Sequence, residues 1–278
     1  MNGTHLLVID PQNDFCDIPQ ELHPVGTEGR RTAPSLPVTG AHQDMLRLGA
    51  WLGQNLTKVD AVTVTLDHHH RLDIAHPGFW RTRTGEVVAP FTQITAEAFA
   101  AGDFTVAPGL DAARAFHYLQ ALEATGRFVH MVWPVHCQIG TWGQCVHAAL
   151  QTTLDAWEDR TGRRVTHILK GENPWTEHYS AMQAEIPDPA DEATGLNRAL
   201  LAKLVQAERV LIAGEAGSHC VRATVEHLVA NWPHTCDRLV IVEDAISPVT
   251  GFEAVYTDFL DRMRQHGLQV ARLDTLTV

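Results

Sequence analysis

The sequence predicts an α/β protein, specifically a three-layer α/β/α sandwich around a mainly parallel, doubly wound six-stranded sheet. Short runs rich in Val, Ile and Leu recur along the 278 residues, and segments with helical periodicity separate them. Continuous apolar runs are typical of strands that are buried on both faces. Strands that alternate with helices form parallel sheets covered on both sides, with right-handed crossovers.

Each apolar run has the length of one strand, and each periodic segment has the length of one helix. The predicted strands are residues 5–9, 61–66, 128–133, 166–169, 210–213 and 239–242, with 270–273 as a further edge strand. The predicted helices are residues 43–56, 110–124, 146–157, 196–206, 221–230 and 253–266. No internal repeat or interdomain linker interrupts this order, so we expect one domain over residues 1–278.

Two long segments break the alternation of strands and helices. Residues 17–38 are rich in Pro and Gly, and residues 77–108 combine weak periodicity with several breakers. Loops of this length are usually functional or disordered. Two interpretations stay open: excursions over the ligand-binding edge of the sheet, with a small hairpin or an oligomer contact, or surface decoration.

The composition limits the classes of partner. Lys and Arg total 21 against 33 Asp and Glu, which gives a formal net charge of −12. Nucleic acids and anionic membranes bind clustered basic residues, so neither is an expected partner. No run reaches the length of a transmembrane helix, and the apolar run at 6–9 is too short for a signal peptide. Five widely spaced cysteines fit free thiols, so we expect a cytoplasmic protein.

Polar side chains follow five of the predicted strands. In an open parallel sheet, ligands bind outside the carboxyl ends of the strands. The residues at those ends are, in chain order, Asp10, Asp67 with His69, Trp133 with His136, Lys170, and the segment 214–220 that ends in Cys220. The sequence therefore predicts an acid, a metal-type cluster, an aromatic ring, a base and a thiol at one edge.

The thiol is Cys220, within GEAGSHCVRATVEHL, where a turn after a strand leads into a helix. A helix N-terminus and a nearby Lys both favour the thiolate, and an Asp can accept its proton. The exposed amides of such a turn can also hold an oxyanion. A buried structural role is the commoner fate of a lone cysteine, but the strand–turn–helix context favours a nucleophile.

The acid and the base are each ambiguous when taken alone. Asp10 in VIDPQNDF fits a turn residue ahead of Pro11, although its position directly after a buried strand favours a role at the site. An isolated Lys170 after VTHIL would be expected at the surface. Their co-location with the thiol is what points to chemistry.

The metal-type cluster comes from LDHHHRLDIAH and WPVHC. One carboxylate and three imidazoles, from Asp67, His69, His76 and His136, suit zinc, manganese or iron. Open coordination positions would hold water or substrate. The outer two imidazoles of the HHH run are expected to be bystanders, because solvated histidines are common in this His-rich chain.

These segments together resemble a known family. VIDPQNDFC, LDHHHRLDIAHPGFW, VWPVHCQIGTWG, ILKGENP and AGEAGSHCVRATV resemble, in order, the signature segments of the nicotinamidase and pyrazinamidase group of isochorismatase-like cysteine hydrolases. The match runs from Asp10 to about Val225. The combination is specific, whereas no single segment is.

The resemblance implies a role for each matching residue. The catalytic triad matches Asp10, Lys170 and Cys220, and the ligands of one divalent metal ion, zinc first, match Asp67, His69, His76 and His136. The aromatics that sandwich a pyridine ring match Phe15 and Trp133. The oxyanion hole matches the N–H groups of Ala216 and Cys220, and a cis peptide matches the Glu215–Ala216 bond. It also implies a small-molecule amide substrate, a homo-oligomer, and a place in NAD salvage.

The function that these features predict is hydrolysis of a small amide, nicotinamide first, through a Cys220 thioester. Asp10 would take the thiol proton and later protonate the departing ammonia, and water would hydrolyse the thioester. Two alternatives stay open: another small amide or carbamoyl substrate on the same fold, or a zinc–water hydrolase in which Cys220 is structural. The sequence departs from the family pattern in its two excursions and in the AGSH that precedes Cys220, so the substrate is less defined than the reaction.

Overall fold

The computed structural model describes residues 3–277, and its centre is a six-stranded sheet in which every neighbouring pair is parallel. The strand order is β10-β9-β8-β1-β2-β7, which confirms the predicted fold class. The strands are β1 (Thr4–Ile9), β2 (Val59–Asp67), β7 (Thr166–Lys170), β8 (Arg209–Gly214), β9 (Leu239–Val242) and β10 (Gln269–Ala271).

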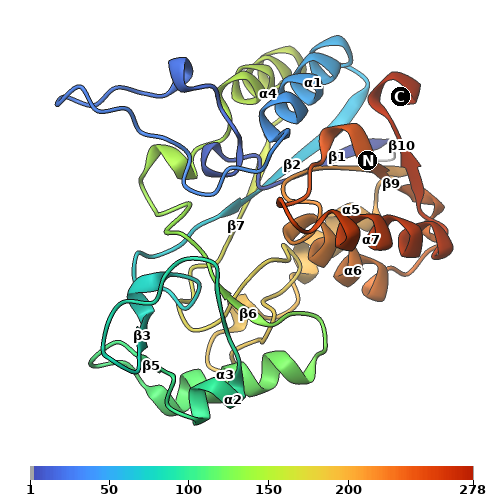
Figure 1. Ribbon diagram of the computed structural model, residues 1–278. Helices are drawn as coiled ribbons and strands as arrows, with labels where there is room; N and C mark the ends of the chain where they lie inside the picture. Colours follow the sequence, from blue (N-terminus) through green and yellow to red (C-terminus); the bar gives the residue numbers. More distant parts are fainter. Residues whose placement is uncertain (1–2, 278) are drawn as a thin grey trace.

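Two helical layers cover the sheet because side chains alternate between its faces. Leu6 and Val8 of β1 pack with α1 and α4, whereas Leu7 and Ile9 pack with α5, α6 and α7. Figure 1 shows α1 and α4 on one side of the strands, with the other three helices opposite. The helices are α1 (Ala41–Gln54), α4 (Ala148–Thr161), α5 (Arg198–Val205), α6 (Cys220–Asn231) and α7 (Glu253–Gln265).

One predicted strand lies outside this sheet. Residues 128–133 contain β6 (His130–Val132), which pairs antiparallel with β4 (Thr92–Ile94). Its side chains alternate between buried and half-buried, which is typical of a ribbon with one covered face. The prediction that this run joins the central sheet is therefore wrong, and β10 is the sixth strand.

The excursion at 77–108 forms much of a small lobe. Its strands β3 (Trp80–Thr82) and β5 (Phe104–Val106) pair antiparallel, and α2 (Ala96–Ala100) packs against α3 (Ala112–Ala124). Trp80 is fully buried in an apolar cluster within this lobe. Figure 1 shows the lobe beyond the ends of the central strands.

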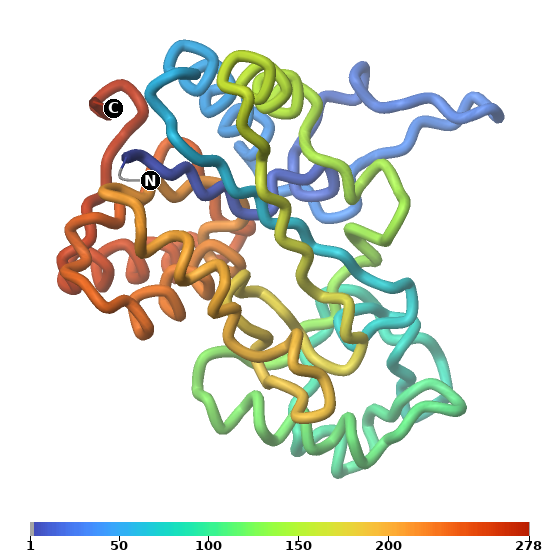
Figure 2. Tube along the Cα trace, turned by 180° about the vertical axis from the view of Figure 1, so that it is seen from behind, coloured from blue at the N-terminus to red at the C-terminus, as the bar shows by residue number. Residues whose placement is uncertain are grey.

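The excursion at 17–38 forms a projecting arm. An antiparallel bridge joins Val25 to Arg31, so the expected small hairpin is present. The arm extends away from the body in both Figure 1 and Figure 2. Its last residues return to the turn that follows β1, where the Val38 N–H donates to the Phe15 carbonyl at 2.9 Å. Across residues 3–277, no helix has both the length and the apolar character that a membrane crossing demands.

Candidate active site

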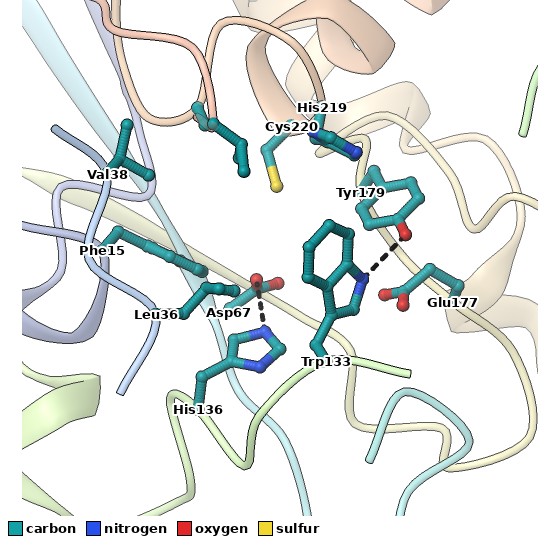
Figure 3. A pocket seen from close by; sticks show the side chains of 12 residues that line it. Phe15, Leu36, Val38, Asp67, Trp133, His136, Glu177, Tyr179, His219 and Cys220 are labelled. Carbon is teal, nitrogen blue, oxygen red and sulfur yellow. Dashed lines mark hydrogen bonds and ion pairs between the residues drawn. The ribbon is translucent and has the colours of Figure 1, made fainter. Parts of the chain in front are cut away.

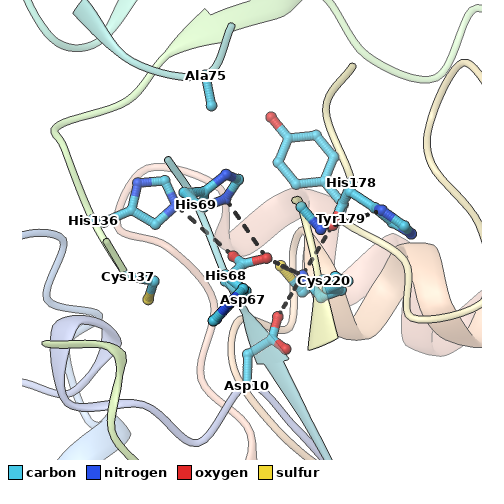
Figure 4. Close-up of polar contacts among 12 residues, drawn as sticks. Asp10, Asp67, His68, His69, Ala75, His136, Cys137, His178, Tyr179 and Cys220 are labelled. Atoms are coloured by element: carbon cyan, nitrogen blue, oxygen red, sulfur yellow. Dashed lines mark hydrogen bonds and ion pairs between the residues drawn. The ribbon is translucent and has the colours of Figure 1, made fainter. Parts of the chain in front are cut away.

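Asp10, Lys170 and Cys220 meet at the carboxyl edge of the sheet, as Figure 4 shows for the acid and the thiol. The Lys170 Nζ lies 2.8 Å from Asp10 Oδ2 and 3.7 Å from Cys220 Sγ. It also pairs with Asp67 and donates to the carbonyl of His178 at 2.9 Å. Three strand ends and the first residue of α6 thus converge on one ammonium group.

Burial controls the protonation of Asp10 and Cys220. It raises the pKa of Asp10 above its usual value, and the Lys170 ammonium offsets the increase only in part. Burial also raises the pKa of the Cys220 thiol well above its usual range, despite Lys170. Removal from water thus opposes the thiolate that the nearby cation favours, which leaves a proton on the thiol for a base such as Asp10 to accept.

Neighbouring strands hold Asp10 in an unusual backbone conformation. Its φ is 45°, in the left-handed region that non-glycine residues rarely adopt. The Thr65 hydroxyl of β2 donates to Asp10 Oδ1 at 2.6 Å, and the Asp10 N–H donates to the Thr65 carbonyl at 3.1 Å. These bonds aim the carboxylate at Lys170.

The segment between β8 and α6 presents two backbone N–H groups near the thiol. Gly214 has a φ of +114°, and a Cβ there would lie 1.9 Å from the Ile9 carbonyl oxygen, so only glycine fits. The next bond, Glu215–Ala216, is cis, as the resemblance implied. Within residues 3–277, neither Ala216 nor Cys220 gives its N–H to a backbone acceptor. These N–H groups are free to receive an oxyanion.

The predicted metal ligands also gather at this edge. One ligand atom each from Asp67, His69 and His136 lie within 4.8 Å of one another, and all three side chains are buried. His76 lies beside them, with its Nε2 3.3 Å from His136 Nδ1 and its ring centroid 5.1 Å from that of His69. Burial, with the two neighbouring imidazoles, lowers the pKa of His76 to about 2, so its ring is neutral.

The donor set fits a divalent transition metal. His69 Nε2 is buried without a hydrogen-bond partner among the described residues. Asp73 Oδ2 lies 3.2 Å from His69 Nδ1, and a carboxylate at that nitrogen leaves Nε2 as the ligand atom. Sequence reasoning missed Asp73, although an acid four residues after a candidate histidine ligand was a usable signal.

A narrow cavity opens onto the thiol and the metal-type cluster. Figure 3 shows Phe15 and Trp133 on facing sides, with Cys220 and His136 between them. The cavity is lined by Phe15, Leu36, Val38, Asp67, Trp133, His136, Glu177, Tyr179, Ala216, His219, Cys220 and Val249.

Several lining residues were not predicted. Tyr179 accepts a hydrogen bond from Trp133 Nε1 at 2.9 Å, and Glu177 is buried beside it. Both lie between β7 and α5 in a segment without regular helices or strands, where no periodic pattern could mark them. His219 directly precedes the thiol, and that position was the signal for it.

Comparison of the sequence with protein-family models and with curated proteins gives no match. Comparison of the structure gives nicotinamidases and pyrazinamidases. Yeast nicotinamidase Pnc1p, bound to the inhibitor nicotinaldehyde, has a TM-score of 0.62 and 18% identity, over 97% of this chain and 99% of that chain. An Acinetobacter baumanii nicotinamidase/pyrazinamidase has a TM-score of 0.61 and 19% identity, over 100% and 99%. Pyrococcus horikoshii pyrazinamidase in complex with zinc has a TM-score of 0.54 and 18% identity, over 97% and 98%. This chain therefore shares their fold, as the resemblance implied.

Replacing the shared ammonium should destabilise the protein. Lys170→Met leaves the Asp10 and Asp67 carboxylates buried without it, and breaking a buried ion pair typically costs about 3–5 kcal/mol. We expect that loss in the free energy of unfolding from urea titration. Lys58→Met, at an exposed lysine, should change it by less than about 0.5 kcal/mol. Equal stability of the two variants would contradict the role given to Lys170.

Proposed function

We propose that this protein is a metal-assisted cysteine amidase that hydrolyses a small amide, nicotinamide first, to the acid and ammonia. The observation that carries the proposal is the Lys170 ammonium between a buried carboxylate and a buried thiol, where the thiol lines an aromatic-walled cavity. A structural cysteine has no need of such neighbours. The solved structures that share the fold bear the names nicotinamidase and pyrazinamidase, which supports the same reaction here.

The proposed reaction begins with proton transfer from Cys220 to Asp10. The raised pKa of Asp10 favours it as the proton acceptor, and Lys170 stabilises the thiolate as it forms. The sulfur attacks the amide carbon, and the N–H groups of Ala216 and Cys220 bind the developing oxyanion. Asp10 returns the proton to the amide nitrogen, the C–N bond breaks, and ammonia leaves. Water then hydrolyses the thioester, giving its proton to Asp10 and releasing the thiol.

The side chains around the thiol account for substrate choice. Phe15 and Trp133 would hold a flat ring between them, because facing aromatic walls suit stacking. Asp67, His69 and His136, with His76 beside them, would hold a divalent ion, zinc first and manganese or iron as alternatives. When bound, the ion supplies a fixed positive charge that can orient a polar atom of the substrate.

The wider setting follows from the same proposal. A nicotinamide-hydrolysing enzyme would work in NAD salvage, and we place it in the cytoplasm as a homo-oligomer, with residues 1–278 as one isochorismatase-like hydrolase domain. Its partner is the small amide rather than nucleic acid or a membrane.

A second candidate is a different small amide or a carbamoyl compound. The observation that favours it is the arm at 17–38, whose returning residues Leu36 and Val38 line the cavity. Their branched apolar side chains lie beside Phe15 in the cavity wall (Figure 3), where they would contact the substrate.

The nucleophile is tested by Cys220→Ala. Removing a catalytic nucleophile costs several orders of magnitude, so ammonia release from nicotinamide should fall at least about 10³-fold while bound zinc is unchanged. Cys145→Ala, at an exposed cysteine, should keep wild-type turnover. Undiminished turnover by Cys220→Ala would instead favour a zinc–water hydrolase.

The substrate is tested by comparing kcat/KM for nicotinamide, pyrazinamide, benzamide and small aliphatic amides and carbamates. We expect the pyridine and pyrazine amides to exceed the aliphatic compounds by at least about 10²-fold, because only a flat ring uses both aromatic walls. A reversed order would replace nicotinamide with the second candidate.

The metal site is tested by His69→Ala. Loss of a ligand should weaken zinc binding at least as much as loss of a supporting residue does, about 10-fold or more. The matched control is His70→Ala, an exposed neighbour, which should bind zinc like the wild type. The measurement is zinc per chain after dialysis against a series of buffered zinc concentrations. Identical zinc affinities of the His69→Ala and His70→Ala variants would contradict the proposed metal site.

A further inference from the structure

The proposed mechanism does not use two acidic side chains that lie at the segment between β8 and α6. This segment, which presents the Ala216 and Cys220 N–H groups, is called the oxyanion segment below. Asp44, in the first turn of α1, is 1% exposed, and Glu215, directly before Ala216, is 0% exposed. Ser247 contacts both carboxyl groups: its hydroxyl donates to Asp44 Oδ2 and its N–H donates to Glu215 Oε2. Two buried carboxylates this close repel each other, and a proton on one of them removes the repulsion and allows a direct hydrogen bond between them.

The surroundings indicate which group is charged. Asp44 pairs with Arg47 and accepts a hydrogen bond from the Ser247 hydroxyl at 2.5 Å. It also lies at the positive end of α1, where a carboxylate is stabilised. Burial raises the pKa of Asp44, but the Ser247 hydroxyl and Arg47 oppose this increase, so Asp44 is the partner better able to hold the negative charge.

Glu215 has far less support for a negative charge. Its Oε2 accepts the Ser247 N–H at 3.2 Å, and its Oε1 is buried without a hydrogen-bond partner among the described residues. Asp17 lies nearby with the same charge. Burial, reinforced by Asp44, holds the pKa of Glu215 well above its usual range. Glu215 is therefore the neutral, proton-donating partner.

The two acids are linked by hydrogen bonds to the backbone that faces the thiol. The Glu215 N–H donates to the Ile9 carbonyl at 2.7 Å, and the Gly217 N–H donates to the Ser247 carbonyl at 2.8 Å. Ser247 thus binds the Glu215 side chain and the backbone two residues later. Ala216, which lines the cavity, lies between these two anchors.

We propose that Glu215 is a positioning residue: as a neutral acid it donates a hydrogen bond to the Asp44 carboxylate and so fixes the Ala216 N–H where the oxyanion forms. The inference rests on the proposed amidase function. It assigns α1, on the opposite side of the sheet from α6, a part in holding the site. It makes no claim on substrate binding, because neither acid lines the cavity.

The test separates the hydrogen bond from simple packing. Glu215→Gln keeps a donor toward Asp44, so kcat should stay within about 3-fold of the wild type. Glu215→Met has a similar volume but no donor. An oxyanion donor is worth about 10²–10³ in kcat, and a misplacement of about 1 Å costs up to about 10²-fold. We expect Glu215→Met to lower kcat about 10- to 100-fold, with KM within about 3-fold.

A matched control and a second variant keep the test decisive. Glu158→Met replaces a half-buried acid of α4, whose Oε1 accepts the Val165 N–H at 2.6 Å, and should leave the kcat of the folded enzyme unchanged. If Glu215→Met does not fold, Asp44→Ala removes the acceptor from the α1 side and should lower kcat by the same factor.

The outcomes distinguish this inference from the proposed function. Wild-type kcat in Glu215→Met or, where that variant does not fold, in Asp44→Ala overturns the positioning role, and so does an equal loss in Glu215→Gln. Absence of amide turnover by the wild-type protein across the substrate panel would instead overturn the amidase proposal itself.

Discussion

The site depends on one buried ammonium, that of Lys170, which pairs with Asp10 and Asp67. A buried charge is tolerated only when it is paired and hydrogen-bonded, so the ends of β1, β2 and β7 must stay in register around it. Asp67 belongs to the metal-type cluster as well, so the same ion pair joins that cluster to the thiol. Burial raises the pKa of Asp10, and the neighbouring Asp67 adds to the increase, whereas Lys170 and His69 hold the pKa of Asp67 well below its usual range. Asp10 is thus the acid that is better able to accept a proton, and Asp67 is the acid that stays charged as a metal-type ligand.

The walls of the cavity come from outside the sheet. Trp133 and His136 follow β6, a strand of the small lobe, while Leu36 and Val38 come from the base of the arm. The strand ends hold the reacting groups rigidly because they are fixed by parallel pairing, whereas the walls belong to segments that can change without disturbing that pairing. In the proposed function, the reacting groups and the groups that would select the substrate therefore come from different parts of the chain.

How far the sequence predicts this protein follows from the same division. The parallel strands were predictable because burial on both faces leaves continuous apolar runs, and the strand-end rule then placed Asp10, Lys170 and Cys220 together. The run at 128–133 has the same apolar character, and only its antiparallel partner in the excursion shows that it lies elsewhere. Tyr179 lies in an irregular segment, where position depends on long-range contacts rather than on local pattern. A motif shows the charges near the thiol, whereas the loss of water that raises the pKa of Cys220 follows only from the folded structure.

The protein holds two clusters of the same composition, each with two buried acids and one cation. In one, Lys170 pairs with Asp10 and Asp67; in the other, Arg47 pairs with Asp44, and Ser247 connects Asp44 to Glu215. Each cluster favours one acid that can carry a proton, since a single cation does not offset two buried negative charges. What differs is the neighbour of that acid. Asp10 lies beside a thiol that can give it a proton, so its protonation can change during a reaction. Glu215 has no such neighbour, so its proton serves to hold a hydrogen bond. The same electrostatic arrangement thus provides a moving proton on one side of the oxyanion segment and a stationary one on the other.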